Sequence, residues 1–350
     1  MRRSFLALLT LVAILFVRVP VRADDLVLDR FGDYLEALRT QAGIPGLAAA
    51  IIGNSDLLWA QGFGKQDVER SIATRTDTPF HLDGLTQLFT ASLILRCVEE
   101  GGLSLDDRVS RFVADAPEPN ATVRQILTHT SDGAGFKYRP ERIDVLGAAI
   151  AACGAEPFRA KLGKEFGWLA MIDSVPGPDV VHMTPTPDGV FTAPVIERYA
   201  RVLDRLATPY AVDSRGRPSV SRYAPATLTA SSGAISTARD LGQFVLGIRK
   251  GIVVRPETLA LAWKPAVGAD GQRLPHGLGW FVQSYNGETI VWQFGVSDNA
   301  SSSLVVTIPG RDLSMVLLAN SDGLSRPFPL AAGDLTASPF GRLFLGAFVR

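Results

Sequence analysis

The sequence predicts an α/β fold of the α+β type, with a mainly antiparallel sheet built from both chain ends and flanked by helices. A helical region is inserted between the two parts of the sheet. Three observations predict this: apolar runs of strand length joined by tight turns near both ends, apolar residues at helical spacing in the middle, and a composition that supports a sizeable core. The chain has 350 residues, of which 47% are hydrophobic and 20% charged.

The first residues predict export. Two arginines precede an apolar run from Phe5 to Val17, and Val21-Arg22-Ala23 then ends the segment. This pattern is typical of a secretory signal peptide over residues 1–23, with cleavage after Ala23 and a mature domain over 24–350. The apolar run is short for a membrane span, although an uncleaved anchor is the alternative. We expect a periplasmic or extracellular protein with no stable membrane span after cleavage.

The mature N-terminus reads as a helix followed by a hairpin. Residues 26–42 carry apolar side chains at helical spacing, and Gly43-Ile44-Pro45-Gly46 ends them. The apolar runs 46–53 and 57–63 flank a turn signal at Asn54-Ser55-Asp56, so we predict two paired strands there.

The middle of the chain is predicted to be helical. Residues 85–100 form an apolar stretch that ends at Gly101-Gly102. Shorter helices are expected at 123–128, 143–153 and 194–207. Proline-rich loops such as 175–188 are too short to separate independent domains. The helical part therefore covers approximately 81–229.

Near the C-terminus the pattern returns to strands. Residues 278–285 and 289–294 flank Asn286-Gly287, a strong hairpin signal. Residues 302–308 and 313–318 flank a second tight turn, and a closing helix is expected over 340–349. The sheet part therefore comprises approximately 24–80 and 230–350.

Charge and cysteine content exclude several functions. The 35 basic and 35 acidic side chains cancel without a basic stripe, so no nucleic-acid partner is predicted. The four histidines are scattered, and neither a metal site nor a cofactor is predicted. Cys97 and Cys153 would be able to pair in an oxidising compartment. Both lie in apolar helical stretches, however, where free thiols behave as small hydrophobes, and we favour free thiols.

Several segments carry a family resemblance. FHLDGLTQLFTA at 80–91 resembles the pattern F-x-x-G-S-x-T-K-x-F-T-A of the beta-lactamase and penicillin-binding-protein family of serine hydrolases, in its class C-related branch. LTHTSDG at 127–133, SSGAISTARDLGQF at 231–244 and HGLGW at 276–280 are similar to further segments of that family. The resemblance covers nearly all of the mature chain and implies the family's fold.

The two residues that start catalysis in that family are replaced. Gly84 stands where the pattern has the nucleophilic serine, and Gln87 stands where it has the lysine base. In that motif the two side chains share one helix face, so that the amine can take the hydroxyl proton. Glycine has no nucleophile and glutamine is neutral. The alternative is that Gly84 is an ordinary entry turn and Gln87 an ordinary helical residue.

Two further elements of the family are partly kept. Tyr138 matches the tyrosine of its Y-x-N motif, whereas Pro140 replaces the asparagine. Without a cationic neighbour a phenol of pKa about 10 is a poor base, so Tyr138 either contacts a ligand or packs under a loop. On the strand that has a basic residue and a glycine in the family, Gln293 replaces the basic residue and Gly295 is kept. The resemblance implies an oxyanion hole between the amides of Gly84 and Val296.

The leading hypothesis is a catalytically impaired, exported member of this family that binds a ligand in the former active-site cleft. A peptide, a cell-wall fragment or a protein partner would each fit. No catalytic residue is assigned, and Tyr138 is the one retained candidate. The predicted binding residues are Gly84, Gln87, Tyr138, Gln293, Gly295 and Val296.

Two alternatives stay open. The first is an active esterase, peptidase or beta-lactamase-like enzyme with a non-standard nucleophile, for which Thr86, Ser131 and Ser236 are the candidates. The second is a scaffold protein whose cleft is filled by Leu85, Trp292 and Phe294. If the cleft is intact, restoring both residues by Gly84→Ser and Gln87→Lys is expected to return acylation.

Overall fold

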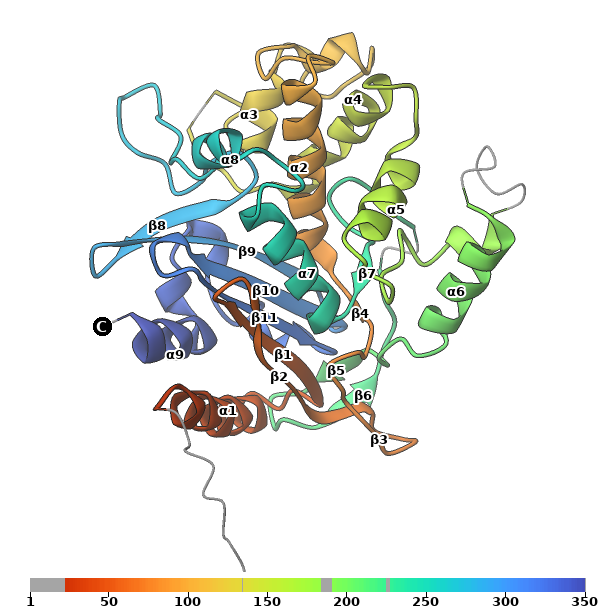
Figure 1. The fold of residues 1–350 in the computed structure, drawn as a ribbon, viewed down its shortest axis with the longest axis vertical. Coiled ribbons are helices and arrows are strands. Elements are labelled where there is room, and N and C mark those ends of the chain that lie inside the picture. The colour runs from red at the N-terminus through yellow and green to blue at the C-terminus, as the bar shows by residue number, and fades with distance from the viewer. Residues whose placement is uncertain (1–22, 134, 184–190, 225–226, 350) are drawn as a thin grey trace, which may run out of the picture.

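A computed structural model of the chain describes residues 23–133, 135–183, 191–224 and 227–349. The predicted signal peptide lies outside these residues except for Ala23. Helices surround a large antiparallel sheet, which confirms the predicted fold class (Figure 1). Among the described helices, none is both long and apolar enough to cross a bilayer.

The described part of the chain forms a seven-stranded sheet in the order β3-β2-β1-β11-β10-β9-β8. Its strands are β1 (Gly46–Gly53), β2 (Asp56–Asp67), β3 (Ile72–Ala73), β8 (Phe281–Tyr285), β9 (Glu288–Ser297), β10 (Ser301–Ile308) and β11 (Leu313–Ala319). The two chain ends meet in the middle of the sheet, where Leu47 of β1 pairs with Ala319 of β11. The two predicted hairpins, β1–β2 and β8–β9, are both present.

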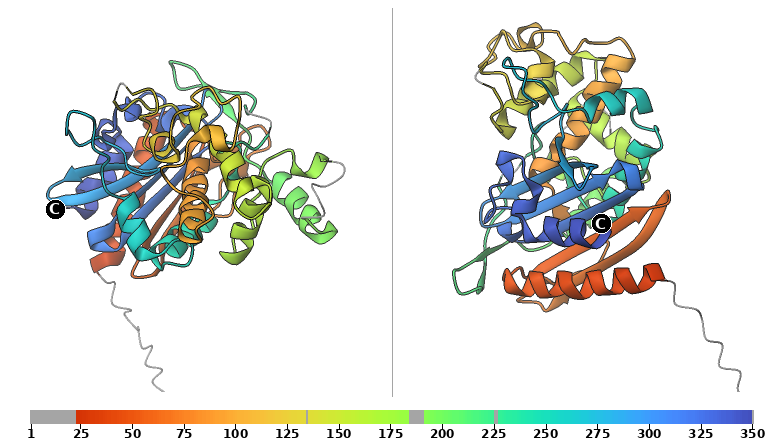
Figure 2. Two further views of the ribbon diagram at one scale, coloured as in Figure 1. Left: turned by 90° about the horizontal axis from the view of Figure 1, so that it is seen from above. Right: turned by 90° about the vertical axis from the view of Figure 1, so that its left-hand side faces the viewer.

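The side chains of β1 alternate between two separate cores because successive residues of a strand point to opposite faces. Ala48, Ala50 and Ile52 face the helical region, whereas Leu47 and Ile51 face the two terminal helices. These terminal helices are α1 (Ala23–Gln41) and α9 (Pro339–Phe348). Figure 2 shows α1 lying along one face of the sheet, with the helical region on the other side.

The helical region consists of α2 to α6, while α7 packs on the sheet itself. The helices are α2 (Thr86–Glu99), α3 (Val123–Leu127), α4 (Leu146–Ala152), α5 (Phe158–Trp168), α6 (Ala193–Leu203), α7 (Ala238–Arg249) and α8 (Pro256–Ala262). Two 3₁₀ turns precede helices: η1 (Asp83–Leu85) before α2 and η3 (Pro140–Val145) before α4. Two short strand pairs complete the fold: β4 (Phe80–His81) with β7 (Ile235–Ser236), and β5 (Tyr210–Val212) with β6 (Pro218–Val220).

Several predicted element boundaries differ from the structure. The predicted helix 143–153 is divided between η3 and α4. The helix predicted to reach residue 207 ends at Leu203, because the N–H groups of Arg205 and Leu206 donate to carbonyls only three residues back. The strand predicted from residue 278 begins at Phe281, because Gly279 has a φ of +96° and interrupts the extended backbone. Helices α5 and α8 were not predicted.

The expectation of two free thiols is wrong, because Cys97 and Cys153 form a disulfide. Cys97 lies in the last turns of α2, and Cys153 directly follows α4. These two helices pack against each other and bring the two Cα atoms to 6.1 Å, within the range that a disulfide spans. An apolar environment, which we expected to favour free thiols, here contains a covalent cross-link between α2 and the end of α4.

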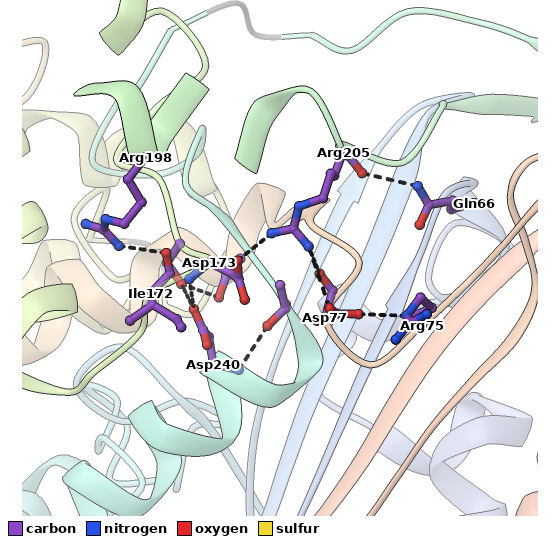
Figure 3. A network of polar contacts seen from close by, with 11 residues as sticks. Gln66, Arg75, Asp77, Ile172, Asp173, Arg198, Arg205 and Asp240 are labelled. Atoms are coloured by element: carbon purple, nitrogen blue, oxygen red, sulfur yellow. Dashed lines mark hydrogen bonds and ion pairs between the residues drawn. The ribbon is translucent and has the colours of Figure 1, made fainter. Parts of the chain in front are cut away.

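A polar network ties the end of α6 to the start of α7 (Figure 3). Arg205 forms an ion pair with Asp173 and donates to the carbonyl of Asp77 at 3.2 Å. The N–H of Asp173 in turn donates to the carboxylate of Asp240 at 2.8 Å. Because Asp240 lies in the first turn of α7, just after β7, this network fixes the β4–β7 pair from which η1 begins.

Candidate functional site

The η1 turn is held in place by a buried carboxylate. Asp83 has a φ of +50°, a left-handed conformation that Asp tolerates better than most residues. Its carboxylate accepts a hydrogen bond from Ser301 Oγ at 2.7 Å, and its other oxygen lies 3.1 Å from His81 Nδ1. Asp83 occupies the place of the glycine in the family pattern, and this replacement was the one sequence signal for the contact.

Gly84 and Gly295 bring the η1 turn and strand β9 into direct backbone contact. A Cβ on Gly84 would lie 2.7 Å from the carbonyl oxygen of Phe294 and 3.2 Å from Gly295 Cα. A Cβ on Gly295 would meet the carbonyl oxygen of Leu82 and would lie 2.8 Å from the amide nitrogen of Gly84. The two predicted oxyanion-hole segments are therefore adjacent. The contact distance leaves no room for a serine side chain at position 84 without movement of the backbone.

A neutral chain of hydrogen bonds occupies the centre of the site. Gln87 Nε2 donates to the carbonyl of Gly84 at 3.1 Å and to the hydroxyl of Tyr138 at 3.0 Å. The Tyr138 hydroxyl donates to Gln293 Oε1 at 3.3 Å, and Gln293 Nε2 donates to the carbonyl of Gly279 at 3.3 Å. The structure thus brings together Gln87, Tyr138 and Gln293, as the sequence predicted.

This chain of groups keeps the phenol of Tyr138 protonated. Burial raises the pKa of Tyr138 well above its usual value of 10, and the hydrogen bond from Gln87 offsets only part of this. The two nearby cationic side chains do not help, because Lys137 is exposed and Arg139 lies 3.8 Å from the carboxylate of Asp132. Gln87 Oε1 is buried without a hydrogen-bond partner among the described residues. Neither the neutral amide of Gln87 nor the protonated phenol of Tyr138 can therefore act as the base.

Aromatic rings and two histidines pack around Tyr138. Its ring lies 4.7 Å from that of His129, 5.1 Å from Phe281 and 5.3 Å from Phe294. The rings of His129 and His276 are themselves 4.7 Å apart. Burial lowers the pKa of His276 to about 4, and burial together with the neighbouring His276 lowers that of His129 well below 6.5. Both imidazoles are consequently neutral at neutral pH.

Within the described part of the chain, the end of β9 next to η1 lacks a strand partner on one side. Strand β8 pairs with β9 only as far as Trp292, whereas β10 continues along it to Ser297. The N–H of Phe294 donates to Gln293 Oε1 at 2.9 Å rather than to β10. Because alternate residues of a strand direct their backbone groups to the same side, Val296 points to this open side as well. Val296 and Gly84 are both half-buried, so this edge reaches the surface.

The profile of the family described as Beta-lactamase matches residues 31–168 and 191–336, which is more than half of the chain. The chain belongs to the beta-lactamase family. Solved structures with the same fold include the octameric penicillin-binding protein homologue from Pyrococcus abyssi. It shares 21% identity and a TM-score of 0.73, with 91% of this chain and 77% of that chain covered. The D-alanine carboxypeptidase AmpC from Burkholderia cenocepacia shares 20% identity and a TM-score of 0.70, with 93% and 100% covered.

Curated relatives match this beta-lactamase-family chain over shorter segments. Esterase EstB from Burkholderia gladioli is 33% identical over 117 residues, which is 29% of this chain and 30% of the esterase. Protein flp from Staphylococcus aureus is 31% identical over 94 residues, 25% of this chain and 19% of flp. The matched segments thus span less than a third of either relative.

The hydroxyl groups proposed as alternative nucleophiles are all engaged elsewhere. Thr86 is fully buried, and its Oγ1 accepts a hydrogen bond from the N–H of Ala234. Ser236 is fully buried against Ser174 at 2.8 Å. Ser131 accepts from the guanidinium of Arg142 at 2.8 Å, and a guanidinium cannot act as a base. None of the three is hydrogen-bonded directly to a side chain that can act as a base, since Ser236 reaches the Asp240 carboxylate only through the hydroxyl of Ser174.

The bulky residues proposed to fill the cleft are part of the two cores. Leu85 and Trp292 are fully buried, and Phe294 is 6% exposed. Leu85 packs in the core on the α2 side of the sheet, and Trp292 and Phe294 pack in the core that contains α9. Of these, Phe294 contributes directly to the site through its carbonyl oxygen and its ring. The described residues contain no group of three His, Cys, Asp or Glu side chains arranged to hold a metal ion.

Proposed function

We propose that this chain is an exported, non-catalytic member of the beta-lactamase family that binds an extended peptide segment at the former catalytic centre. The segment belongs to a free peptide, a cell-wall fragment or a protein partner. The observation that carries the proposal is the hydrogen bond from Gln87 to Tyr138, because it places a neutral amide where the chemistry requires a basic amine.

The loss of the base is reinforced by the close approach of η1 and β9. The carbonyl oxygen of Phe294 occupies the space that a side chain at position 84 would need. A single reverting substitution at either position 84 or position 87 would therefore not rebuild a nucleophile with its base. The close contact between η1 and β9 and the amide of Gln87 therefore both support a protein that does not catalyse the family's reaction.

The open side of β9 supports a peptide as the ligand. An extended peptide can add to an exposed strand edge through backbone hydrogen bonds. Val296 offers its N–H and C=O on the side that β8 leaves unpaired, and Gly84 borders the same edge. One structural relative is described as a D-alanine carboxypeptidase, and a peptide ligand for this chain is consistent with that description.

The absence of catalysis is tested by covalent labelling. The mature protein is incubated with a fluorescent penicillin and with a fluorophosphonate, and its intact mass is measured. We expect no adduct with either reagent. A stoichiometric adduct would refute the proposal, and peptide mapping would identify the nucleophile.

Ligand binding is tested separately by titration of fluorescent muropeptides and of a library of short peptides, followed by fluorescence polarisation. For a peptide that binds, Val296→Pro removes the backbone donor of Val296, which lies beyond the part of β9 that pairs with β8, so the substitution breaks no bond to β8. Val296→Ala is the matched control, since it keeps the N–H. We expect the proline variant to lose at least tenfold in affinity and the alanine variant to bind normally. Equal binding by both variants would place the ligand elsewhere.

A scaffold role is the second candidate, and the contact between Gly84 and Phe294 favours it. If backbone atoms seal the former cleft completely, no peptide will bind at Val296. The same titrations separate the two functions, because a scaffold would show neither a covalent adduct nor a peptide ligand.

A further inference from the structure

The Cys97–Cys153 disulfide lies in the wall of a cavity on the helical region, between α2, α5 and the end of α4. The cavity has a volume of about 210 Å³, and both cysteines line it. Lys161 and Lys164 of α5 and Arg96 of α2 also line it. These residues are separate from Gly84, Gln87 and Tyr138, so the cavity is not part of the former catalytic centre.

Two of the three cations in this cavity are neutralised by acidic neighbours. Lys164 forms an ion pair with Glu156, and Arg96 lies 3.1 Å from Glu100. Lys161 has no carboxylate within ion-pair distance among the described residues, and its Nζ lies 4.0 Å from the sulfur of Cys97. Burial lowers the pKa of Lys161, and the more distant carboxylates of Glu156 and Glu100 offset part of this effect.

The position of Lys161 makes the two sulfurs chemically unequal. An ammonium group next to a cysteine stabilises the thiolate and lowers the pKa of the thiol. In thiol–disulfide exchange the sulfur with the lower thiol pKa is the better leaving group. Cys97 is therefore the expected leaving thiolate and Cys153 the sulfur under attack. Both cysteines are largely buried, with Cys97 3% and Cys153 7% exposed, so an attacking thiol reaches Cys153 through the cavity that both sulfurs line.

We propose that Cys153 is a site of reversible S-thiolation by a low-molecular-weight thiol, with Lys161 acting on Cys97 as a positioning residue. The thiol first loses its proton to solvent. Its thiolate then attacks Cys153 Sγ, a new sulfur–sulfur bond forms there, and the Cys97–Cys153 bond breaks. The electron pair of that bond stays on Cys97, which leaves as a thiolate beside the Lys161 ammonium. The reverse attack by Cys97 restores the disulfide, so the step needs no external oxidant or reductant.

The site of attack can be mapped in the native protein without any substitution. Folded, disulfide-bonded protein is incubated with reduced glutathione as the probe thiol, quenched early with N-ethylmaleimide, and digested for peptide mass analysis. We expect glutathione on Cys153 and the maleimide on Cys97. An adduct on Cys97, or adducts that form only after denaturation, would overturn the proposal.

The role of Lys161 is tested by the rate of adduct formation. Lys161→Met removes the ammonium next to Cys97, and we expect exchange to slow by roughly threefold or more. Lys164→Met removes a paired lysine from the same cavity and is the matched control, with an expected rate close to that of the native protein. Lys161→Arg keeps the charge and should retain most of the rate.

Thermal unfolding of each oxidised variant establishes that it is folded before rates are compared. If Lys161→Met does not fold, Lys161→Gln also removes the charge and is compared with Lys164→Met in its place. Equal rates for Lys161→Met and Lys164→Met in folded protein would show that the ammonium does not select the leaving sulfur, which would overturn this part of the proposal.

Discussion

Gln87 Nε2 lies 3.0 Å from the hydroxyl oxygen of Tyr138, and this hydrogen bond joins α2 to the loop before η3. The bond makes the phenol an acceptor from one amide and a donor to the next, Gln293. A tyrosine in this arrangement links three elements of the structure. Its hydroxyl is therefore expected to contribute to stability rather than to proton transfer.

The first prediction concerns this hydroxyl. Tyr138→Phe removes one hydrogen bond from Gln87 and one from Gln293, although both amides keep their backbone partners. At about 0.5–1.5 kcal/mol for each bond, the loss is about 1–3 kcal/mol in total. We expect the free energy of unfolding, measured by urea denaturation, to fall by that amount. Tyr34→Phe is the control, because Tyr34 is 61% exposed, and it should change little. Equal effects of the two substitutions would contradict the hydrogen-bonded chain.

The second prediction concerns the contact between η1 and β9. Gly84→Ala places a methyl group 2.7 Å from the carbonyl oxygen of Phe294, and a backbone atom cannot move aside cheaply. We expect a loss of about 1–3 kcal/mol, as for other overpacked sites. Gly167→Ala is the control, since a Cβ at this helical position meets nothing within 4 Å and should stabilise α5 slightly. If Gly84→Ala left the free energy of unfolding unchanged, η1 and β9 would be able to move apart at little cost in free energy.

The third prediction revises the expected rescue of activity. The double variant Gly84→Ser with Gln87→Lys restores the family's pair, but the serine meets Phe294 and the lysine meets a protonated phenol with Gln293 beyond it. We now expect no fluorophosphonate adduct by intact mass. Gln87→Lys alone shows whether the amine is tolerated next to Tyr138. A stoichiometric adduct on the double variant would show that β9 can move away from η1 and make room for the serine side chain.

The fourth prediction concerns Glu165, a carboxyl group in α5 that is 1% exposed and contacts Ser92 Oγ at 3.2 Å. Burial raises the pKa of Glu165 to about 8. Between pH 4.5 and 8 the folded protein keeps a proton on Glu165 that the unfolded chain loses. The free energy of unfolding is therefore highest below pH 4.5 and falls by up to about 1.4 kcal/mol for each pH unit up to 8. Glu165→Gln should remove this slope from urea unfolding curves, whereas exposed Glu197→Gln should leave it. An unchanged slope would show that the carboxyl is solvated.

The fifth prediction concerns His276, for which the free energy of unfolding changes with pH in the direction opposite to that for Glu165. Because burial lowers the pKa of His276 to about 4, the unfolded chain binds a proton at mildly acidic pH that the folded protein does not. Stability should fall as the pH drops from about 6.5 towards 4. His276→Phe should flatten this part of the unfolding profile, and His182→Gln, at an exposed position, should not. A profile unaffected by His276→Phe would place the acid sensitivity elsewhere.

Much of the fold follows from local sequence signals. The hairpins at Asn54-Ser55-Asp56 and Asn286-Gly287 depend on turn chemistry within a few residues, and both are present. Helix α5 was missed because Gly163 and Gly167 interrupt its apolar pattern, and its packing against α2 supplies the missing stabilisation. Local patterns left the disulfide as the less favoured alternative, because its formation depends on how two distant helices pack.

The site was predictable in its residues but not in its geometry. Aligned motifs named Gln87, Tyr138 and Gln293, and the structure joins them by hydrogen bonds. No local pattern shows that Phe294 approaches Gly84, because the two residues are distant in sequence and their contact depends on the placement of η1 over β9. The Asp83 carboxylate was missed for the same reason, since its partner Ser301 lies on another strand.

The pairing of β1 with β11 also shapes how the protein folds. Leu47 has no strand partner on that side until Ala319 has been synthesised, so the sheet cannot close while the chain is still growing. Contacts between such distant residues slow folding and leave strand edges exposed in the meantime. Until then the apolar residues of β1, which are all buried in the folded protein, lack their covering strand on that side.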